Sequence, residues 1–135
     1  MKSIFVLFLI LSPILYATAQ SSITVEIFNL ENNKGNVIVA LLDEHEEDFM
    51  DTSSDITNNK CVVIFEDVMP GKYAVRFIHD ENQNEELDTN FLGIPKEGFG
   101  FSNDAMGKFG PKDFSEWLFD VSGDTKIQIT AKYIF

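Results

Sequence analysis

The fold is decided by one stretch of the chain, Met69-Pro70-Gly71-Lys72-Tyr73-Ala74-Val75-Arg76-Phe77-Ile78-His79. Its first three residues carry Pro and Gly, which are typical of a turn. From Tyr73 onward, successive residues of an extended chain point to opposite faces, so Tyr73, Val75 and Phe77 share one side. The stretch therefore predicts a turn followed by a half-buried β-strand over residues 73–79.

Similar short apolar runs occur on both sides of this strand. Residues 23–27 alternate in the same way, whereas residues 36–42 are apolar on both faces, which is typical of a central strand. Further strands are predicted at residues 61–65, 117–121 and 126–133. About seven short strands joined by Gly, Asn, Asp and Pro turns predict an all-β fold, an antiparallel β-sandwich of immunoglobulin-like or prealbumin-like type with one long loop.

Length and charge limit the classes of protein that remain. The 135 residues suit one domain, and the formal net charge of −12 disfavours nucleic acid and anionic membrane surfaces as partners. A single Cys excludes an intramolecular disulfide framework and a Cys-rich zinc site. Cys61 has only apolar neighbours on its C-terminal side, so we expect it to be a buried small hydrophobe.

The N-terminus has the features of a secretory signal peptide. Lys2 precedes an apolar run over residues 4–11, and Ala17-Thr18-Ala19 provides small residues before a cleavage point. Residues 4–16 are too few to span a bilayer, which needs about 20 apolar residues. We therefore expect residues 1–19 to be a signal peptide and residues 20–135 to form one β-sandwich domain. The mature protein should be periplasmic or extracellular, with no membrane span.

Two stretches do not show a strand pattern. Residues 43–51 hold six acidic residues in nine, and we expect a solvated loop or single helical turn with Phe49 tucked inward. Residues 80–116 form a long connection with little periodicity, and connections of that length are usually functional.

The long connection opens with a pattern of oxygen ligands. Side-chain oxygens at Asp80, Asn82, Asn84 and Asp88, with the backbone carbonyl of Glu86, match the alternate spacing of calcium-binding loops. Against calcium, position 6 is Glu85 instead of Gly, and position 12 is Phe91 instead of Glu. The alternative is an Asx-rich turn whose side chains bond their own backbone.

The same connection carries an aromatic cluster and a candidate base. Phe99, Phe101, Phe109 and Trp117 could form a face that binds a glycan or an apolar ligand, or a satellite core that closes one end of the sandwich. His79 beside Asp80 could act as a base in a hydrolase, but no recognised catalytic motif accompanies it.

Five strings of residues are specific in their order and spacing: Pro70-Gly71-Lys72-Tyr73-Ala74-Val75, His79-Asp80-Glu81-Asn82, Leu87-Asp88-Thr89-Asn90, Gly93-Ile94-Pro95-Lys96-Glu97 and Gly98-Phe99-Gly100-Phe101-Ser102-Asn103. Together they resemble the bacterial domain-of-unknown-function 2141 family. The resemblance covers about Val25 to Ile129, and its most specific part runs from Pro70 to Asn103. It implies a small exported protein with a β-sandwich fold and no established activity.

Together these features favour a secreted, non-enzymatic binding or structural module stabilised by calcium, with a protein or glycan partner. One alternative is an accessory domain that binds a glycan or apolar ligand on Phe99, Phe101 and Trp117. The other is a hydrolase that uses His79 and nearby carboxylates.

Export makes a direct prediction about the mature chain. Intact-mass analysis of the exported protein should place its N-terminus at or within a few residues of Gln20, because signal peptidase cuts after small residues. Retention of residues 1–19 in the exported protein would contradict the signal peptide.

Overall fold

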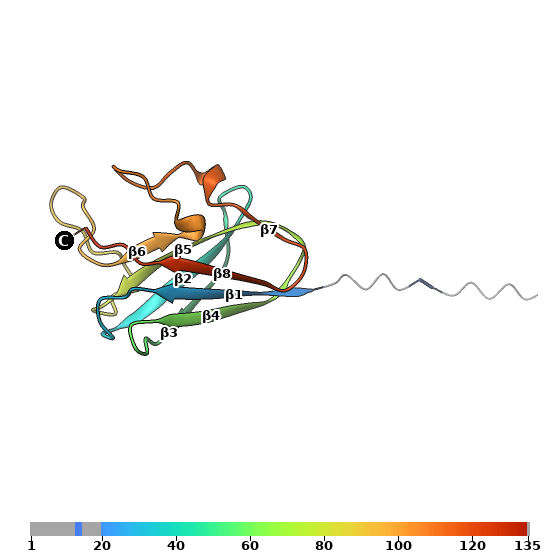
Figure 1. Ribbon diagram of the computed structural model, residues 1–135, viewed down its shortest axis with the longest axis horizontal. Helices are drawn as coiled ribbons and strands as arrows, with labels where there is room; N and C mark the ends of the chain where they lie inside the picture. The colour runs from blue at the N-terminus through green and yellow to red at the C-terminus, as the bar shows by residue number, and fades with distance from the viewer. Residues whose placement is uncertain (1–12, 15–19, 135) are drawn as a thin grey trace, which may run out of the picture.

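The computed structural model describes residues 13–14 and 20–134, which form two packed β-sheets (Figure 1). The signal-peptide prediction falls almost entirely outside the described residues. The strands are β1 (Ser21–Phe28), β2 (Asn36–Asp43), β3 (Asp48–Ser54), β4 (Cys61–Val68), β5 (Gly71–Asp80), β6 (Phe99–Phe101), β7 (Phe119–Val121) and β8 (Thr125–Thr130), with short 3₁₀ turns η1 (Ser102–Asp104) and η2 (Phe114–Glu116).

The two sheets confirm the predicted β-sandwich. One sheet has the order β4-β1-β8, and the other has the order β3-β2-β5-β6 with β7 also paired to β5. All pairings are antiparallel except that of β1 with β8, which is parallel. A parallel pair needs a long connection in the sequence. Here β2 to β7 all lie between β1 and β8 along the chain.

The core lies between the sheets and is built from the alternating residues of the predicted strands. β1 has a strictly alternating burial pattern, and β4 alternates through most of its length. Cys61, which begins β4, is buried as expected, and burial raises the pKa of its thiol. The fully buried side chains on the inner faces include Ile23, Val25, Ile27, Val37, Val39, Leu41 and Val75.

The prediction for residues 43–51 was wrong in its second half. The Asp43 carboxylate accepts hydrogen bonds from the backbone N–H groups of His45 and Glu47, and these bonds hold a turn. β3 starts directly after the turn, at Asp48. β3 is an edge strand with mostly exposed residues, so its sequence lacks the apolar alternation that marks the other strands. Phe49 is not tucked inward: its side chain is 47% exposed and its ring lies beside Tyr73, with centroids 5.8 Å apart.

The later boundaries also differ from the prediction. The long connection contains β6, η1 and η2, and the strand predicted at 117–121 is shortened to β7 because Trp117 caps η2. The last strand ends at Thr130, before the predicted end at Tyr133.

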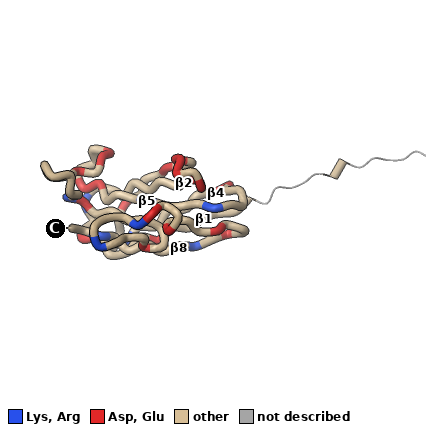
Figure 2. Tube along the Cα trace, turned by 90° about the horizontal axis from the view of Figure 1, so that it is seen from above, with Lys and Arg blue, Asp and Glu red and all other residues tan. Residues whose placement is uncertain are grey.

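Acidic residues dominate the surface charge. Figure 2 shows them along most of the trace, with basic residues scattered between them. The described residues contain no helix long and apolar enough to cross a membrane.

The chain before β2 makes a close backbone contact with the end of β5. Gly35 has a φ of +64°, and a β-carbon built there would lie 2.0 Å from the carbonyl oxygen of Asp80. Only glycine fits this approach without displacing the backbone.

We therefore predict that Gly35→Ala lowers the free energy of unfolding by about 1–3 kcal/mol, as overpacked sites do. Urea denaturation measures it. Gly123→Ala is the matched control, because nothing lies within 4 Å of its built β-carbon, and it should change stability by less than about 0.5 kcal/mol. Equal stability of the two variants would contradict the packing argument.

Candidate functional site

The register of the larger sheet places two rows of side chains on its outer face. Residues directly opposite each other on neighbouring strands point to the same side of a sheet. One row is Ser53, Ile38, Ile78 and Phe99, and the other is Asp51, Ala40, Arg76 and Phe101.

All of these residues except Ser53 line a groove of about 610 Å³, a size typical of small-ligand sites. The groove is mainly apolar. Leu87 reaches it from residues 80–88, called the acidic loop below, and Phe49 and Met50 reach it from the edge strand β3. The other lining residues are Ile38, Ala40, Asp48, Asp51, Arg76, Phe77, Ile78, Phe99 and Phe101.

The charged residues of the groove are not equally paired. Arg76 donates to both carboxylate oxygens of Asp48, at 2.8 and 3.1 Å. Asp51 is exposed and forms no ion pair or side-chain hydrogen bond with any described residue. An unpaired carboxylate therefore stands at the wall of an apolar groove.

The predicted aromatic face is divided between this groove and a satellite core. Phe99 and Phe101 line the groove, although Phe99 is only 6% exposed. Trp117 stacks on Phe101 at 4.2 Å between centroids, and packs with Leu42 and Ala74 over the other half of the outer sheet face. Phe109 is not part of either cluster and is 96% exposed.

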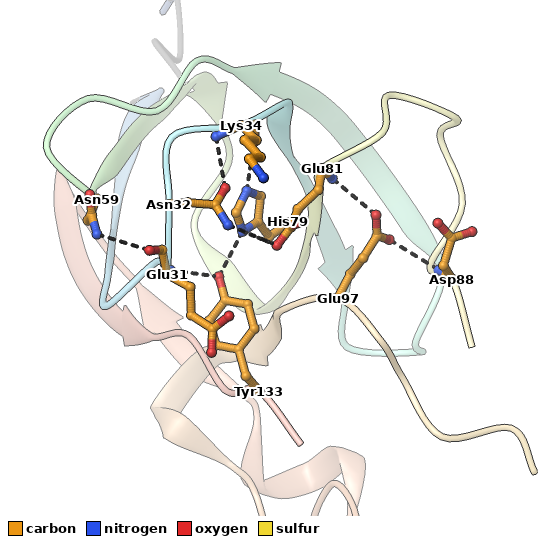
Figure 3. A network of polar contacts seen from close by, with 9 residues as sticks. All are labelled: Glu31, Asn32, Lys34, Asn59, His79, Glu81, Asp88, Glu97 and Tyr133. Atoms are coloured by element: carbon orange, nitrogen blue, oxygen red, sulfur yellow. Dashed lines mark hydrogen bonds and ion pairs between the residues drawn. The ribbon is translucent and has the colours of Figure 1, made fainter. Parts of the chain in front are cut away.

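His79 lies in a buried polar network at the end of β5 (Figure 3). Its Nε2 is 2.8 Å from the carbonyl oxygen of Lys34, which can only accept, so Nε2 carries a proton. In the neutral ring, Nδ1 then accepts from the Tyr133 hydroxyl at 2.7 Å, and that hydroxyl accepts from the Glu31 N–H. Burial raises the pKa of Tyr133 to about 12, which keeps its hydroxyl protonated. Both ring nitrogens of His79 are therefore occupied.

A second buried group, Glu97, joins the network to the acidic loop. Its two carboxylate oxygens accept the backbone N–H groups of Glu81 and Asp88, each at 3.1 Å (Figure 3). Glu81 accepts in turn from the Asn32 side chain at 3.2 Å. Glu97 and Tyr133 were not predicted from the sequence, because neither lies in a pattern that marks a buried polar role.

The acidic loop brings four of its five predicted ligands together. The Asp80 carboxylate is buried and accepts the backbone N–H groups of Asn84 and Glu85. The side-chain amides of Asn82 and Asn84 both donate to Asp88, at 2.5 and 2.8 Å. Glu85 has a φ of +65°, the conformation that the missing glycine would take at lower cost.

In this arrangement the loop's own groups bond one another. The side-chain oxygens of Asn82 and Asn84 accept the N–H groups two residues ahead, as in Asx turns. Glu86 contributes its backbone N–H to this pattern. In the described part of the chain, no three His, Cys, Asp or Glu side chains cluster in a way that could hold a metal ion.

Residues 25–129 match the family described as "Uncharacterized protein conserved in bacteria (DUF2141)". The chain belongs to this family. Comparison with curated proteins and with solved structures gives no match. The resemblance predicted from the sequence is thus confirmed, and the matched residues of this DUF2141 domain run from β1 into β8.

Calcium binding by the acidic loop stays a prediction. The defects at Glu85 and Phe91 suit the weak range of extracellular modules, with a dissociation constant of ~10⁻⁴ to 10⁻³ M. When the calcium concentration is ten times the dissociation constant, an ion that binds only the folded state raises the free energy of unfolding by about 1.4 kcal/mol. This raises the melting temperature by about 3–6 °C.

Melting curves with calcium and with chelator test this prediction. Asp88→Asn should lose the increase, because it removes a carboxylate from the loop, while its remaining oxygen can still accept from one of the Asn82 and Asn84 amides. Asp67→Asn, an exposed acid on β4, should keep it. A wild-type melting temperature that millimolar calcium does not change would leave the Asx turn as the whole account of the loop.

Proposed function

We propose that this DUF2141 protein is an exported, non-enzymatic binding module whose groove receives an apolar group of its ligand. The observation that carries the proposal is the groove itself, on the outer face of the larger sheet. The features of residues 1–19 support export.

The distribution of apolar residues over that outer face supports binding. The solvent face of an antiparallel sheet is usually polar. Here β2 and β5 place Ile38, Ala40, Leu42, Ala74 and Ile78 on this face, beside the single cation Arg76. Only half of this apolar surface is covered: Trp117 packs with Leu42 and Ala74, which are fully buried. Ile38 and Ile78, further along the same strands, remain half-buried within the groove. A partner that covers this apolar surface removes it from water, and this burial favours binding.

The chemistry of the walls favours an apolar ligand over a glycan. Glycans stack on exposed aromatic faces, but Phe99 is almost entirely buried and Phe101 is stacked on Trp117. Phe49 at the edge strand is the one largely exposed ring among the groove residues. Asp51 offers an unpaired carboxylate, so a ligand with an apolar body and a cationic or N–H group fits the groove best.

The environment of His79 supports the non-enzymatic part of the proposal. Its side chain has no solvent-accessible surface, and each ring nitrogen already has a hydrogen-bond partner. A general base must reach the proton it removes, directly or through one water. His79 also does not line the groove.

The neutral fluorophore N-phenyl-1-naphthylamine tests the groove directly. We expect its fluorescence to rise on binding to the wild type, and Ile38→Ser to weaken that binding by roughly tenfold, because part of the apolar contact is lost. Ala40→Trp, which places a large ring in the groove, should also weaken it.

The matched control is Ile64→Ser. Ile64 is a strand isoleucine with an outward side chain, but it lies on the other sheet, away from the groove. Binding that Ile38→Ser and Ile64→Ser weaken equally, or no fluorescence change with the wild type, would favour a purely structural module.

A further inference from the structure

The segment after η1 forms a tight hairpin, residues 105–112, that extends away from the two sheets (Figure 1). The Gly107 N–H donates to the Gly110 carbonyl at 2.7 Å, and the Lys112 N–H donates to the Ala105 carbonyl at 3.0 Å. Phe109 sits at the tip of this hydrogen-bonded turn with 96% of its surface exposed. The turn therefore holds an aromatic ring out in solvent.

The residue beside this ring is an unpaired cation. The Lys108 ammonium lies 5.7 Å from the centroid of the Phe109 ring, and it forms no ion pair with a carboxylate in the described part of the chain. Among the described lysines without an ion pair, Lys108 is the one that stands beside the exposed Phe109 ring. The hairpin tip thus combines one free apolar ring with one free positive charge.

The groove has the complementary pair of features. It is apolar, it is large enough for an aromatic ring, and Asp51 at its wall is an unpaired carboxylate. The hairpin continues the segment that covers half of the outer face of the larger sheet, and the groove occupies the uncovered half. The hairpin tip and the groove therefore lie on the same side of the domain.

We propose that a second copy of this chain occupies the groove: the Phe109 ring enters it, and Lys108 pairs with Asp51 of the other copy. Because each copy has both parts on one side, the contact can be made twice around a two-fold axis and then closes as a dimer. The inference rests on the groove of the proposed function, with the hairpin of another copy as its ligand.

A second exposed tip provides a control within the same molecule. Phe91 is 95% exposed at the tip of another hydrogen-bonded turn, where Asn90 accepts the N–H groups of Leu92 and Ile94. Its immediate neighbours are uncharged, so it lacks the cation that would complement Asp51.

Sedimentation velocity of the exported protein over a range of concentrations tests the dimer. We expect a concentration-dependent dimer, a dimer dissociation constant at least tenfold higher for Phe109→Ser, and no change for Phe91→Ser. A protein that stays monomeric at all concentrations, or a Phe109→Ser variant that dimerises like the wild type, would overturn the proposal.

Charge reversal tests the pairing of Lys108 with Asp51. Lys108→Glu and Asp51→Lys should each weaken the dimer, because each places like charges together at both contacts. The double variant Lys108→Glu/Asp51→Lys should restore the dimer, since it exchanges the two charges. A double variant weaker than either single one would refute the pairing.

Two further outcomes separate this inference from the proposed function. A monomeric protein that still binds N-phenyl-1-naphthylamine would overturn the self-association and leave the groove as a site for another ligand. A monomer that sediments with phosphatidylglycerol vesicles, and loses that binding in Phe109→Ser, would overturn it in favour of a lipid surface. A dimer that competes with the fluorophore for the groove would support both proposals.

Discussion

The antiparallel register of β5 against β2 determines which side chains reach the groove and which reach the core. It places Ile78 opposite Ile38 and Arg76 opposite Ala40, on the outer face. Because side chains alternate along a strand, a slip of one residue would turn these groove residues into the core and expose Val75 and Phe77. Buried contacts hold the end of β5 in place: Gly35 fits against the backbone of Asp80, and both ring nitrogens of His79 are bonded to groups from distant segments.

Much of this fold could be predicted from local patterns. β1, β2, β4 and β5 carry enough apolar residues at the right period to mark them, and the turn before Tyr73 is set by Pro70 and Gly71. β3 could not be found in this way, because an edge strand gains its stability from backbone pairing to β2 and needs few apolar side chains. The parallel pairing of β1 with β8 was equally hidden, since the direction of pairing leaves no mark on either strand.

The candidate site was harder to predict than the fold. The apolar character of both faces of residues 36–42 was correctly interpreted as the sign of a central strand, yet one of those faces is only half covered in the structure. Whether an apolar face is covered depends on where residues 102–118 pack, and no local period encodes that. Glu97 illustrates the same limit: its buried role follows from two backbone N–H groups that the folded loop presents to it.

The charge of the protein places a condition on any contact between two copies. Each molecule carries a formal net charge of −12. At long range this net charge makes two molecules repel each other. Salt at physiological strength screens charges beyond about 8 Å, so this repulsion weakens while contacts buried at short range persist. An interface between copies must therefore gain its free energy from apolar burial and place its few cations against carboxylates. On the hairpin tip, the exposed Phe109 ring supplies the first requirement and the neighbouring Lys108 ammonium supplies the second.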